Sequence, residues 1–383
     1  MKPSWLAASI AGGSLLGLAA KVVVERRRAP SLPRGSVVDA PTVAVLLPVR
    51  DEERDVLACV ETLLSQTVRP FVLVVDDGSA DRTREVAEER ARGEERLAVV
   101  EAGELPAGWT GKVHALAVGE GELGRRGVGA EWVVSTDADT RHGAELVERA
   151  LAAVRGYGLD AVSVAGRQEA EGLVESLLTP AVFAFLDLRL GDWREAAEGR
   201  GPAVANGQFV LVRREALAAS GGFGAVRGAA IDDVALAERL RAAGFSTGFF
   251  RAPEHLRIRM YRGGRDAFSG WRRNLGGLFG RRPGVVAGAL AALLGPPLVA
   301  AALALGGRRA AAALVWAAGA AAFGALRATA GQRPGWALLY PADALALAAA
   351  LTAGTLDRRF GVRPRWKGRR LPSARARSAA TAA

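Results

Sequence analysis

The sequence predicts an α/β domain flanked by N-terminal and C-terminal transmembrane helices. Between residues 40 and 265, short apolar runs rich in β-branched residues alternate with segments of helical spacing, which is typical of parallel strands connected by helices. Acidic residues follow two of these runs, at the strand ends where α/β proteins bind ligands. Outside this region, residues 5–20, 285–305 and 310–326 carry no charged side chain, which favours membrane spans.

Composition narrows the class of protein. The 383 residues include 51 Lys and Arg against 40 Asp and Glu, a formal net charge of +11, and one cysteine, Cys59. A single cysteine excludes a disulfide framework and a cysteine-based zinc site. The basic excess is compatible with nucleic-acid binding, but the basic residues crowd beside apolar segments, and the central region lacks a basic face interleaved with aromatic residues. We therefore expect a membrane surface as partner, and no nucleic acid.

Residues 1–25 are predicted to form an N-terminal transmembrane anchor. The uncharged run 5–20 is extended by three valines, and about 20 apolar residues suffice to cross a bilayer, with Lys21 reaching to the interface. A cleaved secretory signal is disfavoured, because the cluster Arg26–Arg28 follows the apolar run and only one Lys precedes it. Residues 26–40 are predicted to be a basic linker interrupted by prolines.

Residues 285–356 are predicted to be a C-terminal transmembrane region with three apolar runs. The third run, 335–356, contains Asp343 as its only charged residue. Three Ala- and Leu-rich runs so close together favour membrane spans over buried helices of a soluble domain. Pro296-Pro297 should kink or break the first run. An acidic residue inside a span is usually functional or paired with another group.

The basic tail 357–383 predicts the orientation. Lys and Arg concentrate on the cytoplasmic side, and Arg26–Arg28 favours the same side for the segment after the first span. We therefore expect a multi-pass protein of the inner cell membrane, with the central domain facing the cytoplasm. An even number of C-terminal crossings is then needed, so either the run with two prolines is re-entrant or one run lies at the interface. Residues 266–284, which include Trp271, are predicted to be an interfacial amphipathic segment.

The central region, 41–265, is predicted to form one α/β domain. Its apolar runs and its helical spacings predict these elements: strands at 43–49, 71–79, 97–102 and 131–140, and helices at 52–65 and 82–92, with Asp81 as the N-cap of the second helix.

Two carboxylates at the end of the strand 131–140 indicate a metal site. Asp137 and Asp139 are two residues apart, so in a regular strand they point the same way, and two such charges repel unless a cation neutralises them. Mg²⁺ or Mn²⁺ takes oxygen ligands and often bridges a carboxylate to substrate phosphates. The structural alternative is a solvated turn. A second acidic strand end, Asp76-Asp77, strengthens the metal–diphosphate interpretation.

Six segments in order carry a family resemblance: VLLPVRDEE (45–53), VVDDGSADRT (74–83), GWTGKVHAL (108–116), STDADT (135–140), ANGQFVLVRREAL (205–217) and IDDVALAERL (231–240). Together they resemble the inverting family 2 glycosyltransferases, which implies a GT-A fold, a Rossmann-like domain for nucleotide-diphospho-sugars. The terminal spans, GWTGK and RWKGRR (365–370) resemble the membrane-bound subgroup of hopanoid-associated and carotenoid glycosyltransferases.

The resemblance implies roles for individual positions. Those expected at the nucleotide-sugar are Pro48, Arg50 and Glu52 beside the nucleoside, Asp77 at the base with Asp76 supporting it, and Lys112 and Asp137 at the diphosphate. Those expected at the metal and the acceptor are Asp137 and Asp139 as metal ligands, Gly207 and Gln208 in the acceptor-side loop, and Asp233 as catalytic base, with Asp232 where Glu is usual. Asp232 and Asp233 also suit the start of a helix, whose dipole tolerates acids there.

The activity implied is transfer of a single sugar from a nucleotide-sugar, by default a UDP-sugar, to an isoprenoid-type lipid acceptor. A base deprotonates the acceptor hydroxyl, and a divalent cation, Mg²⁺ or Mn²⁺, offsets charge on the leaving diphosphate. The Gln-x-x-Arg-Trp motif of processive polysaccharide synthases is absent, which favours a single transfer. The alternatives are a non-catalytic membrane partner that retains the fold, or a transferase acting on a polysaccharide.

The single cysteine and the three histidines receive no central role in the predicted site. Cys59 lies at helical spacing from apolar residues and is predicted to be a core thiol. His114 and His142 are expected at the surface; for His142, which follows the acidic loop, the alternative is a position lining the site. His255 is a weak candidate for a further metal ligand.

Overall fold

The structure is a computed structural model that describes residues 3–35, 41–190, 192–229, 231–279, 282–329, 332–362, 365–367 and 369–370. Its contacts divide the chain into two compact units. The helical unit comprises Met1–Arg28, Ala170–Gly191 and Tyr261–Val362, and the sheet unit comprises Ala29–Glu169, Asp192–Met260 and Arg363–Ala383. The units therefore interleave along the sequence, whereas the sequence suggested the linear order of a domain 41–265, a membrane region and a separate tail.

The sheet unit is built on a mixed sheet, which within the described residues has seven strands in the order β3-β2-β1-β4-β8-β6-β9. The strands are β1 (Val43–Val49), β2 (Phe71–Asp76), β3 (Leu97–Glu101), β4 (Trp132–Thr136), β6 (Ala161–Ala165), β8 (Phe209–Arg213) and β9 (Thr247–Arg251). β8 runs antiparallel to both of its neighbours, and the other pairings are parallel. The parallel strands β1, β2 and β4 therefore end at a common edge.

Helices cover both faces of this sheet. They are α2 (Val56–Leu64), α3 (Thr83–Ala91), α4 (Gly111–Arg125), α5 (Leu146–Tyr157), α7 (Trp193–Ala197), α8 (Arg214–Ala219), the 3₁₀ helix η1 (Phe223–Val226) and α9 (Asp232–Ala242). Alternation along β1 explains the two cores: Val45 and Leu47 pack with α2 and α5, whereas Ala44 and Leu46 pack with α4 and α9. Both cores are apolar, so β1 is apolar throughout.

Smaller elements complete the sheet unit. β5 (Thr140–His142), β10 (Leu256–Ile258) and β7 (Arg167–Gln168) form a second sheet. Near the end of the chain, β11 (Arg365–Trp366) and β12 (Arg369–Arg370) pair antiparallel. This pair lies within the RWKGRR segment that the resemblance had used.

The predicted strands and helices form, with shifted ends. α2 begins at Val56 rather than at residue 52, and Asp81 accepts a hydrogen bond from the Thr83 amide although Arg82 is the N-cap residue of α3. The largest difference concerns the predicted strand 131–140, because β4 ends at Thr136 and β5 belongs to the second sheet. Asp137 and Asp139 therefore lie in a turn, and the strand argument for their shared direction was wrong.

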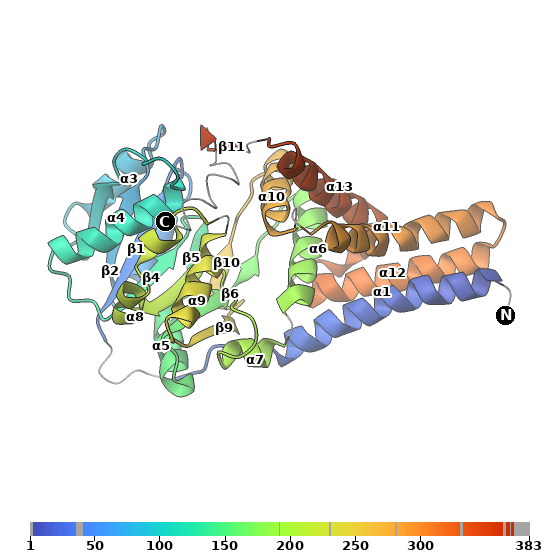
Figure 1. The fold of residues 1–383 in the computed structure, drawn as a ribbon, viewed down its shortest axis with the longest axis horizontal. Coiled ribbons are helices and arrows are strands. Elements are labelled where there is room, and N and C mark those ends of the chain that lie inside the picture. Colours follow the sequence, from blue (N-terminus) through green and yellow to red (C-terminus); the bar gives the residue numbers. More distant parts are fainter. Residues whose placement is uncertain are drawn as a thin grey trace. The chain divides into compact units, whose positions relative to one another are not determined.

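The helical unit consists of α1 (Pro3–Arg28), α6 (Leu173–Leu190), α10 (Gly264–Phe279), α11 (Pro283–Leu305), α12 (Arg309–Thr329), η2 (Pro334–Leu339) and α13 (Tyr340–Arg359). α1 packs along α12, and α10 packs against α13 and α6 (Figure 1). α11 continues through Pro296-Pro297, so the helix does not break there, although the sequence had allowed a break. In α10, the apolar side chains of Trp271, Leu275 and Phe279 are buried within the unit.

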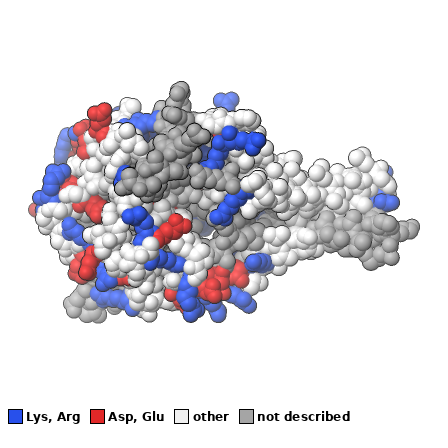
Figure 2. Space-filling model, in the orientation of Figure 1, with Lys and Arg blue, Asp and Glu red and all other residues white. Residues whose placement is uncertain are grey.

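Three helices among the described residues are long and apolar enough to cross a membrane: Pro283–Leu305, Arg309–Ala328 and Pro334–Arg359. This confirms the three C-terminal apolar runs as candidate spans. Figure 2 shows that the surface over α11 and α12 carries few charged side chains away from the helix ends. The side chains of residues 1–11, residues 36–40 of the predicted linker and residues 371–383 of the predicted tail lie outside the described residues. The N-terminal span, the number of crossings and the orientation stay predictions.

Candidate active site

The carboxyl ends of β1, β2 and β4 bring acidic side chains to one edge of the sheet. Asp76 is the last residue of β2, and its carboxylate accepts hydrogen bonds from the amide and the hydroxyl of Ser79, which fixes the turn after the strand. Asp77 is 2% exposed. Its Oδ1 accepts a hydrogen bond from Arg369 at 2.6 Å, and within the described part of the chain its Oδ2 has no hydrogen-bond partner. Oδ2 lies 3.9 Å from Nη1 of Arg50, so two arginine side chains hold the Asp77 carboxylate.

Gly111 explains how Asp77 fits against α4. A Cβ atom on Gly111, the first residue of α4, would overlap Oδ2 of Asp77, so only glycine permits this approach. The carboxylate therefore lies beside the start of a helix, where backbone amides and the helix dipole favour negative charge. The close approach of Asp77 therefore explains why the second glycine of GWTGK, Gly111, is a glycine, which the sequence alone did not show.

Asp137 and Asp139 lie in the turn between β4 and β5, and their charges interact. Burial raises the pKa of Asp139 to about 8, and the charges of Asp137 and Glu52 contribute to that rise. Oδ1 of Asp139 is buried and has no hydrogen-bond partner among the residues described. An unpartnered buried carboxylate oxygen beside further carboxylates is a position that a cation would stabilise.

This pair fits a divalent cation only as part of a coordination sphere. Within the described ranges, no group of three or more His, Cys, Asp or Glu side chains is arranged to hold a metal. Two carboxylates nevertheless match the way Mg²⁺ and Mn²⁺ are commonly bound, with phosphates and water supplying the other oxygens. The residues present therefore fit a cation that arrives with a phosphorylated substrate.

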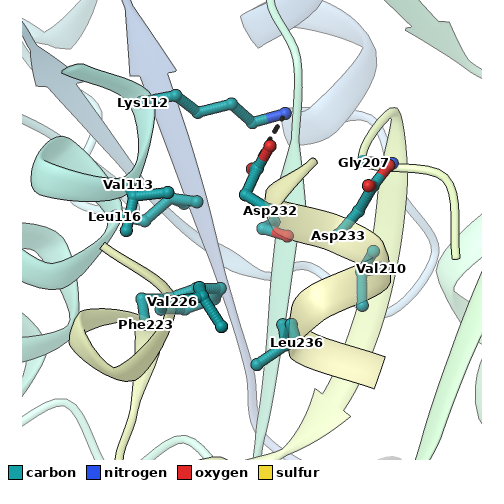
Figure 3. Close-up of a pocket in the computed structure, with 11 residues that line it drawn as sticks. Lys112, Val113, Leu116, Gly207, Val210, Phe223, Val226, Asp232, Asp233 and Leu236 are labelled. Atoms are coloured by element: carbon teal, nitrogen blue, oxygen red, sulfur yellow. Dashed lines mark hydrogen bonds and ion pairs between the residues drawn. The ribbon is translucent and has the colours of Figure 1, made fainter. Parts of the chain in front are cut away.

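Lys112 connects the turn after β4 with the start of α9. Its Nζ lies 2.5 Å from Oδ1 of Asp137 and 3.9 Å from Oδ2 of Asp232. Burial acts to lower the pKa of Lys112, but the charges of Asp137, Asp232 and Asp233 raise it overall, so the ammonium stays protonated. Figure 3 shows its side chain directed towards Asp232.

Asp233 lies on the first turn of α9 and lines a small pocket. Val113, Leu116, Phe223, Val226 and Leu236 provide the apolar side of that pocket, and Lys112, Asp232 and Asp233 its polar side (Figure 3). Burial, together with the neighbouring charge of Asp232, raises the pKa of Asp233 to about 7. A carboxyl group with a pKa near neutrality suits a proton acceptor.

The expected acceptor-side loop meets Asp233 through backbone atoms. The amide of Gly207 donates a hydrogen bond to Oδ2 of Asp233, and a Cβ at Gly207 would lie 2.9 Å from Nζ of Lys112. The side chain of Gln208 is buried and accepts hydrogen bonds from Gln168 and Asn206. Gly207 therefore borders the pocket, whereas Gln208 supports the loop from within.

The residues expected beside the nucleoside lie along β1 and the loop after it. Pro48 is paired with Val75 in β2. Arg50 donates a hydrogen bond to the carbonyl oxygen of Asp77, and Glu52 forms an ion pair with Lys367. Burial raises the pKa of Glu52, and the charge of Lys367 opposes that rise. Glu52 is thus contacted by Lys367, which lies near the end of the chain.

The histidines and the cysteine differ partly from expectation. Cys59 is fully buried, as predicted, and burial raises its pKa to about 12. His114 and His142 were wrongly expected at the surface, since both are buried. His142 hydrogen-bonds Thr62 and Thr136, which suits a structural role. Burial, together with the charge of Arg149, lowers the pKa of His255, and the charge of Glu145 opposes this. Among the described residues, no contact joins His255 to the Asp137–Asp139 turn.

Sequence reasoning missed two residues that contact the site, Lys367 and Arg369. Nζ of Lys367 donates to the carbonyl oxygen of Arg50 at 2.6 Å, and Arg369 holds Asp77. In the sequence both belong to a run of basic residues, which predicted only a cytoplasmic tail. The one available signal was the RWKGRR segment itself, which was used for the resemblance and given no role.

Comparisons with known proteins identify the family and the fold of the sheet unit. A family model described as "Glycosyltransferase like family 2" matches residues 40–266. No curated protein matches the chain. Among solved structures, a mannosyltransferase from Pyrobaculum calidifontis in complex with GDP-Man and Mn²⁺ is 21% identical, with a TM-score of 0.54 over 92% of this chain and 98% of that one. At this level of identity, the match indicates a shared fold.

Two further solved structures resemble the chain less. Glucosyl-3-phosphoglycerate synthase from Mycobacterium tuberculosis, in complex with Mn²⁺, UDP and phosphoglyceric acid, is 19% identical, with a TM-score of 0.43 over 66% of this chain and 85% of that one. Mannosyl-3-phosphoglycerate synthase from Rubrobacter xylanophilus is 19% identical, with a TM-score of 0.42 over 76% and 85% of the two chains.

Proposed function

The chain belongs to glycosyltransferase family 2, and from this premise we propose that it transfers one sugar from a nucleotide-sugar to a lipid acceptor at a membrane, with inversion at the anomeric carbon. It is a glycosyltransferase with a GT-A-like α/β domain and long apolar C-terminal helices. The observation that carries the proposal is the pocket that joins Lys112 and Asp233, beside the Asp137–Asp139 turn.

Asp233 is the proposed base. It removes the proton from the acceptor hydroxyl as that oxygen forms a bond to the anomeric carbon, and the bond from that carbon to the diphosphate oxygen breaks with its electron pair leaving on the nucleoside diphosphate. A pKa of about 7 matches this task, because a weaker base would not take the proton and a stronger one would already be protonated. The Gly207 amide holds Asp233 in place.

The donor is proposed to lie along the carboxyl ends of β1, β2 and β4. Asp77, supported by Asp76, would face the base of the nucleotide, and Lys112 the diphosphate. Asp137 and Asp139 would hold Mg²⁺ or Mn²⁺, which when bound offsets negative charge on the departing diphosphate. The Pyrobaculum structure contains GDP-Man and the Mycobacterium structure UDP, so both nucleotides belong in a donor screen, although the resemblance makes UDP the default.

A membrane-embedded acceptor is proposed from the helical unit. Three candidate spans lie on the same chain as the catalytic pocket, and a transferase held at a bilayer can reach a lipid hydroxyl. The basic residues after the N-terminal segment and at the end of the chain support an inner-membrane protein with its catalytic side in the cytoplasm. The isoprenoid nature of the lipid rests on the resemblance alone.

The test is a donor screen on the full chain in detergent micelles with Mn²⁺. UDP-sugars and GDP-mannose are offered with an isoprenoid-type lipid extract, and lipid glycosides are measured by mass spectrometry, with the Asp233→Asn variant as control. We expect one donor to yield a monoglycosylated lipid only with the unmodified protein. Donor binding without any transfer would favour a non-catalytic partner, and growing sugar chains would favour a polysaccharide transferase.

A further inference from the structure

A short segment from the end of the chain lies over the proposed donor site. We define the C-terminal strap as residues 365–370, of which 365–367 and 369–370 are described. β11 and β12 pair within it, and it belongs to the sheet unit. The family model ends at residue 266, so the strap lies about a hundred positions beyond the segment by which the family is recognised.

Arg369 contacts the residue proposed to meet the nucleotide base. Its Nη1 donates to Oδ1 of Asp77 at 2.6 Å, and a Cβ on Gly78 would lie 3.2 Å from its Nη2. Gly78 has φ +69, so the turn after β2 both needs glycine and leaves room for the guanidinium. Arg369 therefore orients the carboxylate through Oδ1 alone, and Oδ2 of Asp77 has no hydrogen-bond partner in the described chain.

Lys367 contacts the loop after β1. Its Nζ forms an ion pair with Glu52 and donates to the carbonyl oxygens of Arg50 and Asp51. Asp51 has φ +50, a left-handed conformation that is uncommon for residues other than glycine, although aspartate tolerates it better than most. The ammonium of Lys367 binds the carbonyl oxygens of Asp51 and of the residue before it, and thereby helps to fix the loop that carries Arg50 and Glu52.

Charge also favours a role in holding an anion. The proposed donor site gathers the carboxylates of Glu52, Asp76, Asp77, Asp137 and Asp139. Outside the strap, Arg50 pairs with Asp77 and Lys112 with Asp137. Lys367 and Arg369 supply two more positive charges. A nucleoside diphosphate is an anion, so a site without these charges would repel it more strongly.

We propose that the C-terminal strap is part of the nucleotide-sugar site, in which Arg369 positions Asp77 and Lys367 positions the loop after β1 for binding the nucleoside diphosphate portion of the donor. This inference rests on the proposed function. Both are positioning residues, because they contact protein groups that would meet the donor. The segment matched by the family model is, on this view, an incomplete donor site.

The test measures binding of UDP and GDP to the full chain in detergent with Mn²⁺ by calorimetry. The variants are Arg369→Ala, Lys367→Ala and the conservative Arg369→Lys, and the control is Arg200→Ala, whose 67% exposed side chain pairs with Glu198 elsewhere in the sheet unit. We expect the Kd of the preferred nucleotide to rise about tenfold or more in the two alanine variants, the size of one lost charged hydrogen bond. Arg369→Lys should recover part of the loss, and Arg200→Ala should bind like the unmodified protein.

Kinetics separate positioning from general loss of structure. We expect the donor KM to rise in Arg369→Ala with little change in kcat or melting temperature, and the Asp77→Asn, Arg369→Ala double variant to bind no more weakly than Asp77→Asn alone. Equal binding by the unmodified protein and Arg369→Ala would overturn the strap inference alone. Tighter binding by Arg369→Ala would overturn it in favour of an inhibitory plug. An unmodified protein that binds neither nucleotide would overturn the proposed function, and this inference with it.

Discussion

Nζ of Lys112 lies 2.5 Å from Oδ1 of Asp137 and 3.9 Å from Oδ2 of Asp232, so one ammonium group joins the turn after β4 to the start of α9. These two segments are separated by some ninety residues in sequence and carry the proposed metal ligands and the proposed base. The charge of Lys112 also counteracts the rise in the pKa of Asp233. On the proposed function, the charge of Lys112 therefore couples the metal site and the base electrostatically.

Asp233→Asn should abolish transfer while leaving donor binding largely intact. Asparagine keeps the shape of the side chain but cannot accept the proton, and a general base contributes about 10²–10⁴ to a rate. The measurements are kcat in the lipid assay and the Kd of the nucleoside diphosphate. Asp192→Asn, at the N-cap of α7, is the matched control. An equal loss of nucleotide binding in Asp233→Asn would show that this residue is more than the base.

The pH dependence of transfer should follow Asp233. The base acts only when ionised, and its pKa is raised to about 7, so kcat should rise as the pH increases through 7 and level off above it. Asp232→Asn removes the neighbouring negative charge, lowers the pKa of Asp233 and should move this rise to lower pH. The measurement is a pH–rate profile of both proteins. Profiles that coincide would contradict the assignment of the rise to Asp233.

Asp139→Ala should remove metal dependence together with activity. Oδ1 of Asp139 is buried and has no hydrogen-bond partner in the described part of the chain, so a divalent cation would stabilise it, and alanine offers no oxygen ligand in its place. The measurements are transfer at increasing Mn²⁺ and nucleotide binding with and without Mn²⁺. Asp192→Ala should respond to Mn²⁺ like the unmodified protein. Full activity in Asp139→Ala would refute a metal–diphosphate site at this turn.

The sequence predicted β1, β2, β3 and β4, but it did not predict β6, β8 and β9, although these three are also largely buried. β1 and β2 are continuous apolar runs, which indicated strands, and Asp76-Asp77 at the end of β2 indicated the edge where a ligand would bind. The pattern could not give the end of β4, because Thr136 is followed by polar residues that equally suit a strand or a turn. The apolar C-terminal helices were predicted for a similar reason, because each of them is apolar over most of its length.

Contacts between distant segments could not be predicted from the sequence. Arg369 and Asp77 are 292 residues apart, and no periodicity or spacing relates them. α6 was assigned to the central domain because it lies within that stretch of sequence, yet it packs with the helical unit. In both cases, local composition indicates what kind of segment is present. Which part of the protein that segment packs against depends on the fold of the whole chain.

Gly111→Ala should weaken donor binding, whereas Gly121→Ala in the same helix should not. A Cβ at Gly111 would overlap Oδ2 of Asp77 and displace that carboxylate, but a Cβ at Gly121 meets no described atom within 4 Å. Gly121→Ala should raise stability by about 1 kcal/mol, because alanine favours a helix interior. The donor KM and the melting temperature of both variants test this. Unchanged donor KM in Gly111→Ala would show that the position of Asp77 does not matter for the donor.

Asp343→Ala should destabilise the helical unit, because it leaves a buried charge without its partner. Arg327 in α12 and Asp343 in α13 form an ion pair, and each side chain is 1% exposed. Removing one partner of such a pair costs about 3–5 kcal/mol, whereas replacing both by apolar residues is often neutral or stabilising. The single variant should therefore melt well below the unmodified protein in detergent, and the double variant Arg327→Met, Asp343→Leu should melt close to it. A double variant as unstable as the single one would mean that the pair itself holds α12 against α13, through geometry that apolar side chains cannot replace.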